Sequence, residues 1–496
     1  MQEISTDVLI CGAGAAGLAL GIELARRGVP FHIIEKAAMP FAGSRGKGIQ
    51  PRTLEVFEDM GILDRVAALG GFYPLTRKYT ADGFKDEPMM AAEPATSAEP
   101  YTRPIMLAQF LTEGLMRDRL AELGHRVMFG SELTAFKETK DGVTATVGDR
   151  KIHARYLIGA DGGRSFVRRA LNIEFPGQTL AMRAVVADLS LSGLNREFWH
   201  RWGNSHGNQI ALCPLAGTDL FQLQAPVPLE GDVDISAKGL GTMIAERTGR
   251  KDVLVHAVAW ASVYNLNARL ADRYRVGRVF LVGDAAHIHP PTGGQGLNTS
   301  IGDAYNLGWK LAAVLHGAPA ALLDTYEAER RSIAAEVLGL STKLLDAARQ
   351  RGDMQRGREN HQLDLGYRDS ALSLVPPSGL RSAACAVCPG DRAPDAPCRG
   401  AGGQSTRLFH LLRGTHWTLL CNGAANEQIA PREHLRIHAI GAGVVDDGGH
   451  IHDAYALAPD AYVLIRPDGY VSAVVPANEI PALEKHLASV GLAKPV

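Results

Sequence analysis

The sequence has little of several features that mark whole classes of protein. Six cysteines among 496 residues are too few for the disulfide framework of small secreted domains. Lys and Arg number 52 against 53 Asp and Glu, and this balance offers no basic surface for nucleic acid or an anionic membrane. No apolar run reaches the length of about 18 residues that a membrane-spanning helix needs. We therefore expect a cytoplasmic protein without nucleic-acid or membrane partners.

The remaining composition is that of an ordinary globular protein, with 46% hydrophobic and 21% charged residues. A chain of 496 residues is too long for one core, so about three domains are expected. The apolar stretch 8–25 has the hydropathy of a signal peptide. However, Glu3 and Asp7 stand where such a peptide carries positive charge.

Glycine is plentiful, and the motif GAGAAG occupies residues 12–17. An apolar strand at 8–11 precedes it, an alanine-rich helix at 15–27 follows, and a second strand covers 31–35. In this β-α-β context Gly12 permits a tight turn, Gly14 lets the backbone approach a pyrophosphate, and Gly17 lets the helix pack closely on the strand. Glu35 can accept hydrogen bonds from a ribose diol. The residues expected to contact a dinucleotide here are Gly12, Gly14, Ala15, Ala16, Gly17, Glu35 and Lys36.

A second glycine-rich motif, GDAAHIHPPTGGQGLN, covers residues 283–298 and favours a flavin over a nicotinamide. Asp284 can bond a ribityl hydroxyl, and Asn298 is expected to begin a helix whose N-terminus faces the ring and stabilises negative charge on it. The ring environment is assigned to Pro291 and to the backbone of Gly296, Leu297 and Asn298. His287 and His289 are expected to shape this loop, and no metal site is predicted because further ligands are lacking.

Together with DGGRSFVR at 161–168, these motifs resemble the class A flavoprotein aromatic monooxygenases, which have a p-hydroxybenzoate hydroxylase-like fold. The similarity extends over residues 5–345. It implies bound FAD, and it implies that the motif at 161–168, with Asp161, touches both the flavin and the nicotinamide cofactor. A plainer interpretation is that Asp161 caps the next helix. The resemblance also assigns Arg45, Gln109 and Leu133 to FAD. Arg52 matches the pattern too, although a structural salt bridge would explain it.

The resemblance implies a reaction as well. It predicts hydroxylation of an aromatic substrate, phenolic or polyketide-like, by O₂ through a flavin C4a-hydroperoxide. The resemblance implies that NADPH or NADH binds as a transient co-substrate, and the presence of only one nucleotide-binding glycine motif agrees with this. No general base can be named from the sequence. Two alternatives stay open: an antibiotic-modifying monooxygenase of the rifamycin or tetracycline type, and a non-catalytic FAD-binding protein. A homodimer is also left open.

The expected fold class is α/β, with a Rossmann-like FAD-binding domain of the GR2 type, an inserted antiparallel sheet and a thioredoxin-like C-terminal domain. The FAD-binding domain takes residues 1–177 and, with long helices, 271–380. The substrate-binding sheet takes 178–270, where alternating apolar runs begin. A linker is expected at 381–405, and a mobile surface loop at 83–104. The candidates for contact with the substrate are Trp202, Gln209, Phe221, Gln222, Gln224 and Trp260.

The C-terminal residues 406–496 contain YVLIRPDGY at 462–470, which is similar to the thioredoxin-like domain of phenol and polyketide hydroxylases. A working thioredoxin needs two cysteines in a CxxC motif after its central strand. Here that place reads Cys421-Asn-Gly-Ala, so we expect the domain to be redox-inactive. Cys385 and Cys388 have CxxC spacing within the linker. Zinc binding, redox activity and chance are the options, and chance is favoured because a zinc site would need a second ligand pair.

Overall fold

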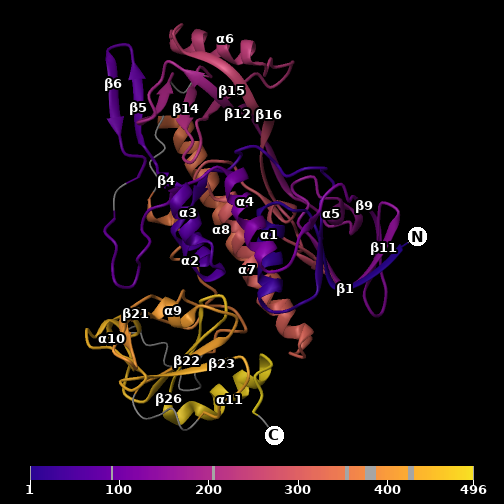
Figure 1. The fold of residues 1–496 in the computed structure, drawn as a ribbon, viewed down its shortest axis with the longest axis vertical. Helices are drawn as coiled ribbons and strands as arrows, with labels where there is room; N and C mark the ends of the chain where they lie inside the picture. The colour runs from indigo at the N-terminus through magenta and orange to yellow at the C-terminus, as the bar shows by residue number, and fades with distance from the viewer. Residues whose placement is uncertain are drawn as a thin grey trace.

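Three structural units follow one another along the long axis of the molecule (Figure 1). The computed structural model describes residues 2–90, 93–203, 207–351, 357–374, 387–422 and 429–494. A mostly antiparallel sheet covered by α6 (Ala237–Thr248) lies at one end, a nucleotide-binding unit lies in the middle, and the C-terminal unit lies at the other end.

The nucleotide-binding unit is built on a sheet with the strand order β17-β18-β11-β1-β2-β8. The core of β1 is the apolar run 8–10, which is fully buried because strands flank it and helix α1 covers it. Strands β18, β11, β1, β2 and β8 run parallel, whereas β17 is antiparallel, and β9 and β10 extend the sheet as an antiparallel meander on β11. Their bounds are β1 Gln2–Cys11, β2 Phe31–Ile34, β8 Val127–Met128, β9 Leu133–Glu138, β10 Val143–Val147, β11 Arg150–Gly159, β17 Arg275–Val276 and β18 Val279–Leu281.

Seven helices pack around this sheet in the described part of the chain. Helix α1 packs on α7, and both bury small residues, which lets their backbones approach. The helices are α1 Ala15–Arg26, α2 Pro51–Met60, α3 Leu63–Leu69, α4 Gln109–Glu122, α5 Phe166–Ala170, α7 Gly296–Leu315 and α8 Asp324–Arg351. A small sheet of β3 (Gly48–Ile49), β7 (Ile105–Met106) and β4 (Gly71–Phe72) lies beside α2 and α3.

The inserted sheet has the order β19-β16-β12-β15-β14-β13-β5-β6. The antiparallel sheet expected at 178–270 is present, and its long strands β12 and β16 run back toward the nucleotide-binding unit (Figure 1). Residues 83–87, expected to begin a mobile loop, instead pair with β5 as strand β6; that prediction was wrong for this stretch. The strands are β5 Leu75–Thr80, β6 Gly83–Glu87, β12 Gly177–Ser192, β13 Phe198–Trp202, β14 Ile210–Pro214, β15 Phe221–Val227, β16 Leu254–Leu270 and β19 His287–Ile288.

The C-terminal unit is a sheet with the order β21-β20-β24-β23-β22-β25-β26. Strand β20 lies inside the stretch 381–405 that we expected to be a linker. It is part of the sheet instead, because Ala393, Ala396 and Cys398 are buried in this unit's own core. The elements are β20 Pro397–Gly400, β21 Ser405–Arg407, α9 Leu408–Leu412, β22 Trp417–Asn422, β23 Leu435–Ile440, β24 Val444–Val445, α10 His450–Tyr455, β25 Ala461–Ile465, β26 Val471–Pro476 and α11 Ile480–Ser489.

A buried cluster of charges joins the C-terminal unit to the two long helices. Arg466, just after β25, donates to both carboxylate oxygens of Glu329 on α8, at 2.7 and 2.9 Å. Lys310 on α7 donates to the same carboxylate at 2.6 Å, and Asp468 accepts a bond of 2.7 Å from Arg466. These four side chains are at most 1% exposed. The cluster joins the C-terminal unit to α8 and to α7, the helix that follows the loop at 283–298.

No helix in the described ranges is both long and apolar enough to cross a membrane.

Candidate functional site

A cavity of about 780 Å³ lies where the nucleotide-binding unit meets the inserted sheet. Its wall comes from stretches far apart in the sequence: the loop after β1, the end of β2, the start of α4, the loop after β11 and the turn before α7. Most residues singled out from the sequence line it, namely Gly12, Gly14, Ala15, Ala16, Glu35, Lys36, Arg45, Gln109, Leu133, Asp161, Asp284, Pro291, Gly296, Leu297 and Gln224.

The three glycines after β1 meet different neighbours. Gly12 has a φ of +111°, and a Cβ on it would collide with the backbone carbonyl of Ala160. A Cβ on Gly17 would collide with the carbonyl of Gly12, so this residue serves helix packing and lies outside the cavity wall. Gly14 is different, because the nearest atom to its Cβ position is Glu113 Oε1 at 3.8 Å. The protein itself leaves the space at Gly14 open on the cavity side.

Glu35 lies at the end of β2 with its carboxylate fixed by the loops around it. One oxygen accepts from the Ala13 amide at 3.0 Å, and the other accepts from the Ala37 amide at 2.9 Å. Because each carboxylate oxygen has further lone pairs, the group can still accept hydrogen bonds from a ligand. The arrangement holds an acceptor at the place where a ribose diol was expected.

Glu113 is a buried acid of the cavity that the sequence motifs did not reveal. Its Oε1 accepts from the Gln109 side chain at 2.8 Å, one helical turn away on α4. The Gln109 oxygen in turn accepts from the Gly46 amide at 3.2 Å. Burial raises the pKa of Glu113. The spacing of four residues from Gln109 was the available signal, since on a helix it places both side chains on one face.

One carboxylate oxygen of Asp161 accepts hydrogen bonds, and the other has no partner among the described residues. Its Oδ2 accepts from the amides of Phe166 and Val167 at 2.7 and 3.1 Å, so it caps α5 as the plainer interpretation has it. Its Oδ1 is buried, and within the described part of the chain it has no hydrogen-bond partner. Arg168 of the same motif donates to the Ala285 carbonyl at 2.8 Å. The motif at 161–168 thus holds the 283–298 loop and also presents an unsatisfied acceptor at the cavity wall.

Helix α7 begins at Gly296, two residues before the expected start at Asn298. Asn298 is buried and acts as a clamp: its oxygen accepts from the Gln50 amide at 2.8 Å, and its amide group donates to the carbonyls of Gly48 and Gly294 at 2.9 and 2.7 Å. Its side chain is therefore occupied by backbone groups and lies outside the cavity wall. At Gly296 no neighbouring atom lies within 4 Å of a Cβ position, so the start of the helix is open toward the cavity.

His287 and His289 lie on the loop before α7. The ring of His287 bonds the Asp303 carboxylate at 2.6 Å, and Arg330 donates to the other oxygen of that carboxylate at 2.8 Å. Burial opposes ionisation of Asp303, but His287 and Arg330 hold its pKa below the ordinary value. The His289 ring lies 4.8 Å from that of His287, lines the cavity, and has its pKa depressed well below the ordinary value by burial. Within the described ranges, no three His, Cys, Asp or Glu side chains are placed to share a metal ion.

Of the six residues proposed for the substrate face, Gln224 lines the cavity. The other five are not among its lining residues in the described part of the chain. Trp202 and Phe221 belong to the core of the inserted sheet, and the Gln209 carbonyl accepts from Arg247 at 3.0 Å. Gln222 is buried beside Gln224, and Trp260 packs edge-on against Phe41.

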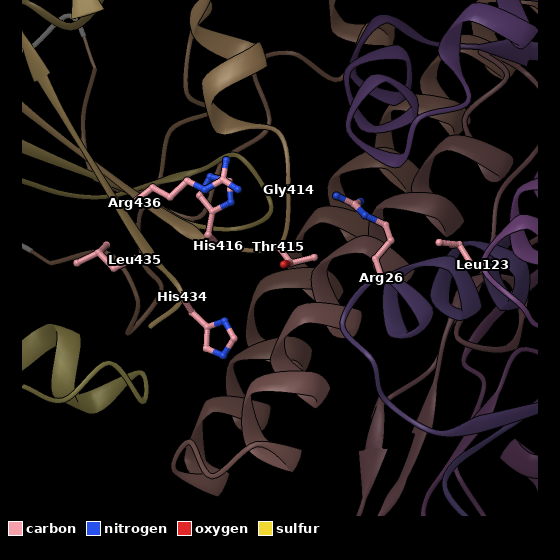
Figure 2. Close-up of a pocket in the computed structure, with 8 residues that line it drawn as sticks. All are labelled: Arg26, Leu123, Gly414, Thr415, His416, His434, Leu435 and Arg436. Carbon is pink, nitrogen blue, oxygen red and sulfur yellow. The ribbon is translucent and has the colours of Figure 1, made fainter. Parts of the chain in front are cut away.

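A second groove, of about 470 Å³, lies between the C-terminal unit and the nucleotide-binding unit. Figure 2 shows Arg26 and Leu123 on one side of it and His416, His434 and Arg436 on the other. Arg26 is engaged by Glu23 and Asp59, each at 2.7 Å. None of the residues lining this groove belongs to the sequence motifs, so the larger cavity is the candidate site.

Comparison with known proteins identifies the family. An FAD binding domain family matches residues 5–341, and the C-terminal domain family of aromatic-ring hydroxylases matches residues 387–491. A flavin-dependent monooxygenase of Mycobacteroides abscessus is 39% identical, over 94% of this chain and 96% of that protein. This chain belongs to the flavin-dependent monooxygenase family.

Other members of the family are similar over the full length. The 12-dehydrotetracycline 5-monooxygenase/anhydrotetracycline 6-monooxygenase of Streptomyces rimosus is 34% identical, over 94% of each chain. The crystal structure of aklavinone-11 hydroxylase with FAD and aklavinone has a TM-score of 0.84 and 26% identity, over 99% of each chain. The resemblance inferred from the three motifs is thereby confirmed.

The cavity of this flavin monooxygenase fits the FAD of its family. The open space at Gly14 matches the close approach of a pyrophosphate, and the unsatisfied Asp161 Oδ1 is a buried acceptor that awaits a donor. Asp284 is exposed, lines the cavity and has no hydrogen-bond partner among the described residues. The polar groups of the cavity suit a ligand with several hydroxyl groups and a phosphate. Carboxylates that can accept from hydroxyls and backbone amides that can donate to phosphate lie in one cavity.

Proposed function

We propose that this protein hydroxylates an aromatic substrate of phenolic or polyketide type, with NAD(P)H and O₂ as co-substrates. One observation carries the proposal. A single cavity joins the glycine loop after β1 to Val186 and Gln224, which face each other across β12 and β15 of the inserted sheet. A ligand that extends from the dinucleotide end therefore meets a substrate held by that sheet.

Residues of the dinucleotide end are assigned roles by their chemistry. The Gly12–Gly17 loop and the N-terminus of α1 would hold the pyrophosphate, and Glu35 would bond a ribose. Asp161 and Asp284 would accept from hydroxyl groups of the chain between phosphate and ring. Lys36, Arg45, Gln109 and Leu133 line the same cavity and complete the proposed contacts.

The ring end would be formed by the start of α7. Bound FAD supplies the electron transfer and oxygen activation of the reaction, which protein side chains cannot perform themselves. The free backbone amides of Gly296 and Leu297 and the dipole of α7 would stabilise negative charge beside them. Pro290 and Pro291 line the cavity in front of this helix and offer no N–H group. They would form an unreactive wall that keeps water from the reacting atoms.

We further propose that the C-terminal unit is a thioredoxin-like domain without disulfide exchange. Two features support this: the parallel pair β22–β23 lies next to the antiparallel hairpin β25–β26, and α11 follows the last strand. Burial raises the pKa of Cys421 to about 12, which suppresses the thiolate that exchange requires. Cys388 is described, but Cys385 lies outside the described residues, so the CxxC pair carries no assignment.

Fused-ring antibiotics are a narrower substrate class within the same proposal. The relative from Streptomyces rimosus is named for anhydrotetracycline, and the aligned structure contains aklavinone. A modification of a tetracycline- or rifamycin-type compound would therefore use the same cavity and the same co-substrates.

The test is turnover by the FAD-loaded enzyme with a panel of simple phenols, polycyclic polyketides and antibiotics. Oxygen uptake, NAD(P)H consumption and product mass are followed together, and the expected product contains one additional oxygen atom. Stopped-flow absorbance should also show that a substrate speeds flavin reduction by NAD(P)H. If every compound yields hydrogen peroxide alone, the proposed hydroxylation is wrong. If no reductant reacts with the flavin, the non-catalytic alternative holds.

A further inference from the structure

The groove between the C-terminal unit and the nucleotide-binding unit is separate from the candidate site (Figure 2). It meets helix α1 at the C-terminal end of that helix, whereas the larger cavity meets the first turn. The two walls share no residue. The residues that line the groove are Arg26, Leu123, Gly414, Thr415, His416, His434, Leu435 and Arg436.

Arg436, the second residue of β23, is a cation of this groove without a counter-ion. It is exposed, and its side chain forms no hydrogen bond or ion pair with the rest of the described chain. Burial lowers the pKa of His416 to about 4 and also lowers that of His438, and the charge of Arg436 lowers both pKa values further. No acidic residue is among those that line the groove in the described ranges. The charge of Arg436 is therefore available to an anion.

The opposite wall supplies hydrogen-bond donors that are held in place. Arg26 is 8% exposed, and its Nη1 donates to Glu23 and Asp59, each at 2.7 Å. Its Nε and Nη2 groups have no partner among the residues that the structure describes. Because the two carboxylates balance the charges of Arg26 and Arg27, Arg26 offers donors to a ligand rather than net charge. Asp59 also accepts from the Gly414 amide at 2.7 Å, so it fixes both walls of the groove.

The remaining surface of the groove is neutral. The hydroxyl group of Thr415, beside the two arginines, makes no hydrogen bond within the described part of the chain. The His434 ring stacks on His316 with the ring centres 6.4 Å apart, and it offers a flat face. Leu123 and Leu435 add apolar surface. An uncharged part of a ligand can therefore be covered next to the charged end.

We propose that this groove binds the phosphate group of a small phosphate monoester, with Arg436 as its cation and with Arg26 and Thr415 as further donors. Donors on two opposite walls suit a tetrahedral phosphate, whose three terminal oxygens point in different directions, better than a planar carboxylate. The groove volume of about 470 Å³ leaves room for an organic group beside the phosphate. A bound ester connects the C-terminal unit to α1. The proposal is independent of the reaction proposed for the larger cavity.

The experiment is calorimetric titration of the FAD-loaded enzyme, in which the dinucleotide end of the larger cavity is filled. The probes are glucose 6-phosphate, glucose and inorganic phosphate, at a constant ionic strength of about 0.15 M. Glucose 6-phosphate contains neither an aromatic ring nor a nucleobase, which the larger cavity would attract. It should bind with a Kd below about 1 mM, and glucose should not bind. Inorganic phosphate should bind about tenfold more weakly, because it lacks the organic part.

Arg436→Gln should weaken the binding of glucose 6-phosphate at least about tenfold, because a charge-assisted hydrogen bond is lost. Thr415→Val should weaken it about threefold to tenfold, because one neutral donor is lost. Lys485→Gln removes the same charge from an exposed position on α11 and is the matched control, with unchanged binding. The ester should also raise the melting temperature of the natural chain and not that of Arg436→Gln.

Four results would overturn the proposal. They are no binding of the ester by the natural chain, equal binding of glucose, inorganic phosphate that binds as tightly as the ester, and undiminished binding by both Arg436→Gln and Thr415→Val. Because no turnover is measured, each of these results is separate from a failure to hydroxylate an aromatic substrate.

Discussion

Gly12 and Gly14 stand two residues apart, yet they are constrained by different partners. The protein itself requires Gly12, since a side chain there meets the Ala160 carbonyl at a positive φ of +111°. Gly14 has an ordinary backbone conformation, with a φ of −77°, and free space beside it. Only a ligand in the cavity would forbid a side chain at Gly14.

Gly14→Ala should therefore separate binding from folding. The apoprotein should keep its melting temperature, because the added methyl group meets its nearest neighbour at ordinary contact distance, 3.8 Å. FAD affinity should fall at least about tenfold, because the methyl group keeps the pyrophosphate away from the loop. The measurements are quenching of FAD fluorescence on titration and thermal unfolding of the apoprotein.

The comparison variant is Gly12→Ala, in which the apoprotein itself should lose stability. FAD binding by Gly14→Ala with undiminished affinity would show that no phosphate approaches this position. A lower melting temperature of the Gly14→Ala apoprotein would show instead that the free space at the loop is not available to a side chain.

At the level of elements, the loop before α7 is held by side chains rather than by regular secondary structure. Asn298 bonds three backbone groups from two separate segments, and Thr292 donates to the Ser341 carbonyl at 2.8 Å. Arg168 holds its beginning at Ala285. The position of the α7 N-terminus therefore depends on a small number of polar contacts.

Asn298→Ala should lower both stability and FAD affinity. The change leaves the Gln50 amide and the Gly48 and Gly294 carbonyls without their partner, and each unsatisfied buried group costs about 1–3 kcal/mol. We expect a loss of about 3 kcal/mol in the free energy of unfolding, measured with urea. Asn265→Ala, at an exposed asparagine on β16, is the control and should have little effect. Equal stability of the two variants would contradict the clamp.

At the scale of the whole molecule, acid should weaken the attachment and the stability of the C-terminal unit. Burial lowers the pKa of His416 and of His486 to about 4. The unfolded chain takes up these protons first, so stability falls as the pH drops from about 6.5 to about 4, by up to about 3 kcal/mol for each histidine. Burial opposes ionisation of Glu329, but Arg466 and Lys310 hold the pKa of this carboxyl group well below its usual range. Its contribution is present above the unfolded pKa of about 4.3 and is lost as the pH falls further.

Urea unfolding at a series of pH values between about 7.5 and about 4, in steps of about half a unit, checks this expectation. Replacing His416 and His486 with Asn should flatten the pH profile in that interval. His256→Asn, at an exposed histidine on β16, should leave the profile as it is. A double variant as acid-sensitive as the natural chain would exclude the two histidines as the cause.

The sequence predicted those parts of the molecule in which local chemistry decides the structure. The β-α-β unit and the long strands of the insert are strongly periodic apolar segments, and they lie where expected. The glycine and acid motifs likewise gave most of the cavity wall, because a ligand-binding loop needs particular residue types. Strand β20 was missed, since its burial depends on a distant sheet.

Lys47 and Glu113 were missed for a related reason. Neither belongs to a recognised motif position, although both line the cavity. The aromatic candidates show the opposite error, since they were predicted to line the site and do not. Trp202 and Phe221 have the composition of a substrate face, but the alternation of a strand does not tell which side is the protein core, and both lie in that core.

The composition of the cavity wall has a consequence for the synthesis of the protein. Its segments leave the ribosome one after another: the first loop at residues 11–16, the middle segments by residue 169, and the turn before α7 only at residues 284–297. Strand β18, which completes the parallel sheet beside β11, emerges just before that turn. The cavity of a nascent chain therefore stays incomplete through more than half of the synthesis. FAD can bind the complete cavity only when the chain is well past its midpoint.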